Sequence, residues 1–259
     1  MNRLYTEVRG DGPALVLLHG WGLNVRVWDG LTAALCDRFR IIVVDLPGHG
    51  RSVWLPERSS LEGQAAQVSE TVAAIAAEYS LLGWSLGGQV ALQLAAAQRA
   101  VDRQVLIAAT PRLTVGPDWP HGAPPERLSA QAEGLETDYR RTVSDFLELQ
   151  VRGSAGSAEA LEQLRAALFA HGYPGVAALA RDLQLLRETD LRPRLGDIIQ
   201  PTLVIAGQYD RVTLPAASHA LAHGLPNARY VEIRRAAHAP FLSHLPELSA
   251  LIRDFLLRT

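Results

Sequence analysis

The sequence predicts an α/β protein in which helices cover both faces of a mostly parallel sheet. Short apolar runs that end at glycine- or proline-containing loops alternate with stretches whose apolar residues recur about every 3.6 positions. The first pattern is typical of buried strands and the second of helices, and their alternation favours a parallel sheet. One long all-helical stretch interrupts the alternation, and we expect it to form a cap over the core.

Six segments carry the strand pattern. They are Ala14–Leu18, Arg40–Asp45, Leu81–Gly83, Val105–Ala109, Thr202–Ala206 and Arg229–Ile233. Helical periodicity marks the core segments that alternate with them, which are Val27–Leu35, Leu61–Ala77, Leu86–Ala97, Ala216–Leu225 and Leu245–Leu257. Strands this continuously apolar indicate a sheet that is buried on both faces.

The stretch between about Pro111 and Asp197 contains no convincing strand. It begins with a coil rich in proline and glycine and continues with four helical patterns, at Gln131–Gly134, Asp138–Val151, Ala158–Ala170 and Gly175–Arg187. Because the chain returns directly to a strand at Thr202, we interpret residues 111–197 as a helical cap inserted into a core of residues 1–110 and 198–259. A second, independent domain is the alternative interpretation.

The composition excludes several classes of function. A formal net charge of -2 gives no overall field that would attract nucleic acid or an anionic membrane. The 25 basic side chains are all arginine, which excludes a lysine nucleophile, and Cys36 has no second cysteine for an intrachain disulfide. No apolar run approaches the ~20 residues that span a bilayer, and no signal pattern opens the chain. We expect a cytoplasmic monomer without nucleic-acid or membrane partners.

A nucleophile motif lies between a predicted strand and a predicted helix. Gly83-Trp84-Ser85-Leu86-Gly87 matches G-x-S-x-G, in which a strained strand-to-helix turn exposes the serine hydroxyl. The residues two before and two after the serine pack against each other across that turn, so a side chain at Gly83 or Gly87 would collide. A chance Gly-Ser-Gly turn is the alternative, which the strand–turn–helix context disfavours.

Two backbone amides are candidates for an oxyanion hole. Acyl transfer develops negative charge on the carbonyl oxygen, and the residue after the nucleophile supplies one N–H donor, here Leu86. The loop His19-Gly20-Trp21-Gly22 follows another strand and supplies the second, most simply from Trp21. We interpret His19 as a structural residue that holds this loop rather than as a base.

The catalytic base is sought late in the chain, because this type of site has the order serine, acid, histidine. His219 and His223 lie on a helical stretch and read as surface residues. His238 follows the last strand and precedes the last helix, where a loop reaches the carboxyl edge of the sheet. We therefore assign His238 as the base, with His244 as the alternative.

The acid should precede this histidine and follow a strand. Asp210 does so, just past Thr202–Ala206. Asp182, Asp190 and Asp197 lie in or beside the helical stretch with no strand before them, and we expect solvated surface charges there. Asp45 ends a strand but precedes the nucleophile, which is the wrong order.

Several motifs together resemble a known family. Asp45–Ser52 (D-L-P-G-H-G-R-S) is similar to a loop seen widely in α/β-hydrolases. Leu17–Asn24, Leu82–Gly88 and Ala236–His244 resemble the pimeloyl-[acyl-carrier protein] methyl ester esterases of biotin synthesis. Parts of the predicted cap, Arg141–Gln150 and Arg187–Arg192, resemble them as well. The resemblance implies the α/β-hydrolase fold and the removal of a methyl group from a carrier-bound pimeloyl ester.

The resemblance also implies a protein partner. Acyl carrier protein is acidic and would dock on basic residues of the cap, for which Arg140, Arg141, Arg152 and Arg165 are candidates, with solvated helix surface as the alternative. Asp145 departs from the family, because we expect a basic residue at that position. The chemistry itself does not depend on this departure.

The sequence therefore predicts a carboxylic ester hydrolase with a Ser85–His238–Asp210 triad and an acyl-enzyme. No metal or organic cofactor is required. Trp21, Trp84 and Phe146 are candidates to line an apolar slot for the acyl chain, with core packing as the alternative for each. Rival functions are a general short-chain carboxylesterase, a C–C bond hydrolase or lactonase of the same fold, and a non-catalytic ligand-binding module.

Overall fold

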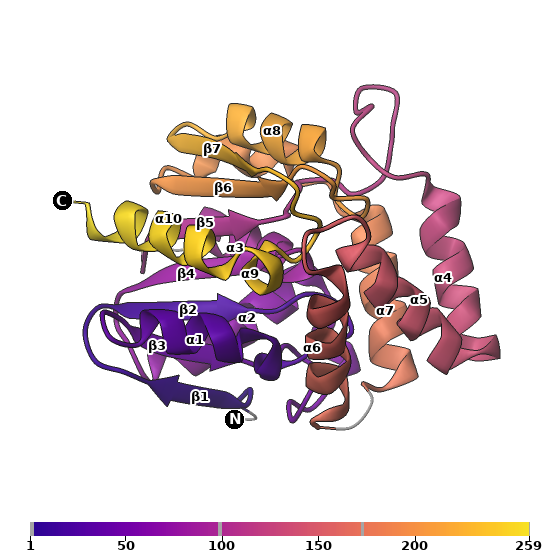
Figure 1. Ribbon diagram of the computed structural model, residues 1–259, viewed down its shortest axis with the longest axis horizontal. Coiled ribbons are helices and arrows are strands. Elements are labelled where there is room, and N and C mark those ends of the chain that lie inside the picture. Colours follow the sequence, from indigo (N-terminus) through magenta and orange to yellow (C-terminus); the bar gives the residue numbers. More distant parts are fainter. Residues whose placement is uncertain (1–2, 98–99, 172–173, 259) are drawn as a thin grey trace.

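A seven-stranded sheet forms the centre of the protein in the computed structural model, which describes residues 3–97, 100–171 and 174–258. The strand order is β1-β3-β2-β4-β5-β6-β7. The strands are β1 Thr6–Arg9, β2 Ala14–Leu18, β3 Arg40–Val44, β4 Tyr79–Trp84, β5 Val101–Ile107, β6 Thr202–Gly207 and β7 Ala228–Ile233. All neighbouring pairs are parallel except β1 with β3, so the expected α/β architecture is confirmed (Figure 1).

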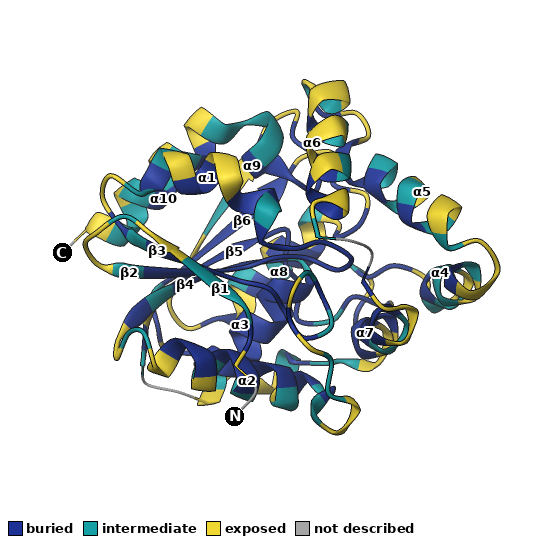
Figure 2. Cartoon of the chain, turned by 90° about the horizontal axis from the view of Figure 1, so that it is seen from below, coloured by how far each residue is buried: buried dark blue, intermediate teal, exposed yellow. Residues whose placement is uncertain are grey.

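Helices cover both faces of this sheet. Helices α1 and α10 lie on one face and α2 and α3 on the other (Figure 2). The helices of the core are η1 Val25–Trp28, α1 Asp29–Leu35, η2 Pro56–Arg58, α2 Leu61–Ala73, α3 Leu86–Ala97, α8 Pro215–Gly224, α9 Pro240–Ser243 and α10 Leu245–Leu257. None of the described helices is both long and apolar enough to cross a bilayer.

Four helices stand between β5 and β6 in the chain and lie beyond the carboxyl ends of the strands (Figure 1). They are α4 Pro125–Thr137, α5 Tyr139–Val151, α6 Ser157–Phe169 and α7 Val176–Glu188, followed by the short η3 Arg192–Asp197. Helix α4 begins earlier than the periodicity indicated, because Pro124 and Pro125 open it instead of belonging to a coil; proline is well tolerated in a first helical turn. The division into a core and a cap near residues 111 and 197 remains our proposal.

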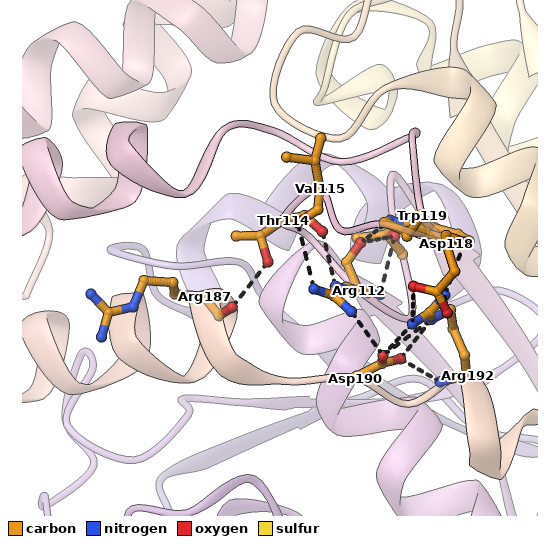
Figure 3. Close-up of polar contacts among 9 residues, drawn as sticks. Arg112, Thr114, Val115, Asp118, Trp119, Arg187, Asp190 and Arg192 are labelled. Carbon is orange, nitrogen blue, oxygen red and sulfur yellow. Dashed lines mark hydrogen bonds and ion pairs between the residues drawn. The ribbon is translucent and has the colours of Figure 1, made fainter.

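Asp190 joins the two linkers that enter and leave these helices (Figure 3). Its carboxylate accepts from Arg112 on the incoming linker at 3.2 Å and from Arg192 on the outgoing one at 2.6 Å. Arg192 also reaches Asp118 at 3.0 Å. The hydrogen bonds from Arg192 hold the pKa of Asp190 below its usual value. Asp190 therefore connects the two linkers through its ion pairs, and it is not the solvated charge that the sequence suggested.

Asp190→Ala should lower the stability of the protein by about 1 kcal/mol, because it leaves two arginines without their shared carboxylate. For a chain of this size that corresponds to a fall of roughly 2–4 °C in Tm. Asp197→Ala is the matched control, since Asp197 is 56% exposed and its one ion pair among the described residues is with Arg194 on the same helical turn. Equal melting temperatures for the two variants would contradict the role given to Asp190.

Candidate active site

Ser85 occupies a strained turn between β4 and α3. Its φ of 56° lies in the left-handed region, which an L-residue adopts only when its surroundings hold it there. A Cβ on Gly83 would lie 2.4 Å from the carbonyl oxygen of Gly87, so the strand and the helix touch across the turn. The Ser85 amide donates to the Ile107 carbonyl of the neighbouring strand at 3.1 Å. These contacts fix the serine at the carboxyl edge of the sheet.

His238 and Asp210 meet at the same edge. Nδ1 of His238 lies 2.8 Å from Oδ2 of Asp210, while Oδ1 accepts from the amides of Val212 at 2.8 Å and Thr213 at 3.0 Å. A hydrogen bond to a carboxylate requires the proton on Nδ1 and leaves a lone pair on Nε2. Nε2 is buried and has no hydrogen-bond partner among the described residues. The orientation of the ring therefore leaves the acceptor nitrogen free, as a general base requires.

The backbone of His238 is held from two further sides. Its amide donates to the Gln150 carbonyl in the last turn of α5 at 2.9 Å, an oxygen that has no partner inside the helix. Its carbonyl accepts from the indole nitrogen of Trp84, the residue before Ser85, also at 2.9 Å. A Cβ on Gly207, at the end of β6, would lie 2.0 Å from the Ala237 oxygen. The loop that carries His238 therefore packs closely against the strand before Ser85 and the strand before Asp210.

Two buried histidines organise the loop that carries Trp21. Nε2 of His49 accepts from the Gly22 amide at 3.1 Å, and Nε2 of His19 accepts from the Leu46 amide at 3.0 Å. Burial lowers the pKa of His19 to about 4 and that of His49 to about 3, so both stay neutral and keep an acceptor nitrogen. His19 thus has the structural contacts expected from the sequence.

The same loop presses against the start of α3. A Cβ on Gly87 would lie 2.3 Å from the Leu18 carbonyl oxygen. The amides of Trp21 and Leu86 have no acceptor among the described residues. These two N–H groups are therefore free to receive an oxyanion.

An apolar pocket opens beside the serine. Its cavity volume is about 30 Å³, so the pocket is narrow. The lining residues are Trp21, Ser85, Leu113, Ala123, Arg127, Leu128, Gln131, Phe146, Leu183, Leu186 and Val212. The rings of Trp21 and Phe146 meet edge to face with centroids 5.0 Å apart. Among the described residues, no group of three or more His, Cys, Asp or Glu side chains could hold a metal ion.

Comparison with known proteins assigns the family. A sequence model described as "Alpha/beta hydrolase family" matches residues 15–251. The chain belongs to the alpha/beta hydrolase family. A hydrolase from Pseudomonas aeruginosa has the same fold, with a TM-score of 0.83 and 28% identity, covering 98% of this chain and 94% of that one. The enol-lactonase from Burkholderia xenovorans superposes with a TM-score of 0.85 at 25% identity, covering 98% and 96%.

More similar sequences belong to one group of esterases. The pimeloyl-[acyl-carrier protein] methyl ester esterase of Nitrosomonas europaea is 41% identical over 245 residues, which cover 94% of this chain and 95% of that protein. The protein of the same name from Stenotrophomonas maltophilia is 40% identical over 252 residues, covering 97% and 96%. The resemblance found in the sequence, and with it the α/β-hydrolase fold, is confirmed.

The Trp84 side chain lies in the core of this hydrolase and not in the pocket, where the sequence suggested it as a lining residue. Only 1% of it is exposed, and it is not among the pocket residues. Its ring packs on Trp28, Phe241 and the His238 ring. The reason is that Ser85 leaves the strand in a left-handed turn, so the residue before it stays in the core. Trp84 therefore holds His238 in place, while Trp21 and Phe146 line the pocket.

The other histidines considered from the sequence have neighbours other than Asp210. His244, the alternative base, has its Nδ1 2.8 Å from the Ser243 hydroxyl at the junction of α9 and α10. His219 and His223 pack on each other on α8 with ring centroids 5.1 Å apart. No hydrogen bond of the described residues joins any of them to Asp210, whose ring partner is His238.

Asp182 is a buried carboxyl group, contrary to the expectation of a solvated charge. It lies on α7, is 2% exposed and accepts from Gln64 of α2 at 2.6 Å, while its other oxygen has no hydrogen-bond partner among the described residues. That oxygen is 3.8 Å from Nε2 of His49. Burial raises the pKa of Asp182 to about 7, against a smaller opposing effect of Gln64. Helical periodicity could have found this residue, because Asp182 shares the apolar face of α7 with Leu179 and Leu186.

The four arginines proposed for carrier docking differ in their surroundings. Arg165 pairs with Glu148 at 3.3 Å and Glu162 at 2.9 Å, and Arg141 lies 3.7 Å from Asp145. Arg140 and Arg152 are exposed and form no ion pair with the described residues. Nearby carboxylates therefore offset the charge of Arg165 and Arg141 more than that of the other two.

Asp210→Asn should lower kcat for a p-nitrophenyl ester by about 10⁴-fold with little change in fold. The amide can still accept from the amides of Val212 and Thr213, but its NH₂ group would face Nδ1 of His238 and favour the tautomer with the proton on Nε2. Initial rates and circular dichroism measure the two effects. Asp197→Asn, an exposed aspartate outside the site, should leave kcat unchanged; a comparable loss there, or a fully active Asp210→Asn, would contradict the assignment.

Asp182→Asn should stabilise the protein above pH 7 and have little effect near pH 4. The unfolded chain releases the Asp182 proton near pH 4, whereas the folded protein holds it to about pH 7, so stability falls as the pH rises between these values. Asparagine cannot ionise, and its gain at pH 8 should be about 1–4 kcal/mol. Urea unfolding at pH 4, 6 and 8 measures it.

The control for this pH dependence is Asp102→Asn, since Asp102 is 69% exposed. Its stability should follow that of the wild type at all three pH values. A pH-independent effect of Asp182→Asn would show that the carboxyl group is already ionised in the folded protein.

Proposed function

We propose that this hydrolase cleaves the methyl ester of a pimeloyl group carried on acyl carrier protein, with Ser85 as nucleophile, His238 as base and Asp210 as the orienting acid. The observation that carries the proposal is the His238 ring, which is hydrogen-bonded to Asp210 through Nδ1 and whose buried Nε2 has no hydrogen-bond partner among the described residues. Trp84, which binds the His238 carbonyl, directly precedes Ser85, and Ser85 lines the apolar pocket. Ester hydrolysis is the activity named for the relatives at about 40% identity.

The reaction proceeds through an acyl-enzyme. Ser85 Oγ attacks the ester carbonyl while Nε2 of His238 takes its proton, and the amides of Trp21 and Leu86 receive the developing oxyanion. The bond to the methoxy oxygen then breaks, and the imidazolium protonates it to methanol. A water molecule, deprotonated by His238, attacks the acyl-enzyme and releases the carboxylate and the free serine. Protein groups and water supply every step.

The substrate is inferred from the relatives' names. Near-complete coverage of both chains means that the cap and the core are compared together, and not the catalytic motifs alone. The lining of the pocket is mainly apolar, which suits methylene groups beside a scissile ester. A cytoplasmic location and a monomeric state are part of the proposal.

Docking of the acidic carrier is assigned to exposed arginines of the cap. Arg140 and Arg152 are the strongest candidates, since they have no carboxylate partner among the described residues, while Arg141 and Arg165 are secondary. Charge pairing of this kind acts mainly on the association rate and weakens with ionic strength.

The direct test compares the hydrolysis of three substrates: methanol release from carrier-bound pimeloyl methyl ester and from a small methyl ester, and ring opening of an enol lactone. We expect the carrier-bound ester to have the highest kcat/KM, and Ser85→Ala to lose both turnover and labelling by a fluorophosphonate. Cleavage of the lactone without cleavage of either methyl ester would support the rival class and contradict the proposal.

Carrier docking is tested by reversing charge. The double variant Arg140→Glu/Arg152→Glu should lower kcat/KM for the carrier-bound ester by about 10-fold or more at low salt, and leave the small ester unchanged. Arg229→Glu/Arg258→Glu is the charge-matched control, because both arginines are exposed on the core beside Asp254. An equal loss in the two double variants would argue against a docking site on the cap.

A further inference from the structure

Two polar side chains interrupt the apolar wall of the pocket beside Ser85. Arg127 and Gln131 both lie on α4 and both line the pocket. Residues four apart project from the same face of a helix, so the two groups stand one turn from each other. The remaining wall is formed mainly by Leu113, Leu128, Leu183, Leu186 and Val212. Neither polar group has a role in the triad or the oxyanion hole.

Arg127 is a half-buried cation without an anionic partner in the described part of the chain. Its one hydrogen bond there runs from Nη1 to the Arg211 carbonyl at 2.9 Å. Burial lowers the pKa of the guanidinium, while the nearby Asp210 carboxylate acts in the opposite direction; arginine nevertheless keeps its proton at neutral pH. Nε2 of Gln131 is also buried and has no hydrogen-bond partner in the part of the chain that the structure describes. Unpaired donors of this kind cost free energy unless a ligand satisfies them.

We propose that Arg127, assisted by Gln131, binds a second carbonyl-bearing group at the far end of the acyl chain, so that the pocket selects esters of dicarboxylic acids over esters of simple fatty acids. The bound group is an acceptor oxygen, from either a free carboxylate or a thioester. The apolar side chains that line the same pocket as Ser85 and Arg127 take the methylene groups. This inference rests on the proposed function and names the determinant of its specificity. Arg127 is a binding residue for the distal group and takes no part in proton transfer.

The test compares three methyl esters with the same seven-carbon acyl chain. Methyl heptanoate has no distal acceptor, monomethyl pimelate has a carboxylate, and the N-acetylcysteamine thioester of monomethyl pimelate has a thioester carbonyl. Arg127→Met should raise KM by about 10-fold for at least one of the two bifunctional esters, with kcat and the constants for methyl heptanoate changed less than about twofold. Whichever bifunctional ester loses affinity identifies the acceptor.

Methyl heptanoate also reports on the triad in the same variant. Because Arg127 contacts the backbone next to Asp210, its loss could disturb the acid, and all three esters would then lose kcat alike. That outcome, or an unchanged KM for every ester, would overturn the inference. Arg187→Met is the matched control: it is 42% exposed on the cap, contacts Ser129 and Glu188, and does not line the pocket.

A binding measurement separates this inference from the proposed function. Calorimetric titration of Ser85→Ala and of Ser85→Ala/Arg127→Met with the same three esters gives Kd without turnover. Tighter binding of a bifunctional ester that the second substitution abolishes supports the inference even if the wild type releases no methanol from the carrier-bound ester. Equal affinities for all three esters would overturn it while methanol release continued to support the proposed function.

Discussion

The position of the His238 backbone is the constraint on which the candidate site depends. Three segments far apart in the chain hold this residue: Asp210 binds the ring, Gln150 of α5 accepts from the amide, and Trp84 donates to the carbonyl. Because Trp84 immediately precedes Ser85, the proposed nucleophile and the proposed base are joined through one residue, by a peptide bond on one side and a hydrogen bond on the other. These contacts fix the position of His238 relative to Ser85.

Close backbone contacts make that frame possible. Gly83 meets Gly87 across the serine turn, Gly87 meets the end of β2, and Gly207 meets the histidine loop. A side chain at any of these points would push apart two segments that carry reacting groups. The helices between β5 and β6 contribute as well, since α5 holds His238 and α4 and α7 line the pocket, while Asp190 ties their two linkers together.

Strong local patterns allowed the sequence to predict the sheet and the residues proposed for the triad. Strands β2 to β7 are buried apolar runs, and the order serine, aspartate, histidine left few candidates. The edge strand β1 was missed because its four residues, T-E-V-R, are half-exposed or exposed and form no apolar run. Asp182 and Trp84 were misplaced because burial of a carboxyl group and the direction of a ring at a strained turn depend on tertiary packing. Arg127 was missed because the prolines at the start of α4 hid its first turn. Gln131 was placed in a helical pattern, but its direction toward the pocket depends on tertiary packing.

A crystal structure of the protein inactivated with an alkyl p-nitrophenyl methylphosphonate, which loses p-nitrophenol to the attacking hydroxyl, would test the central claim most directly. The account predicts a covalent bond at Ser85 Oγ, Nε2 of His238 within hydrogen-bond reach of that oxygen, and the phosphonyl oxygen about 3 Å from the amides of Trp21 and Leu86. An adduct on another residue, or a His238 ring that points away from Ser85 in the adduct, would contradict it.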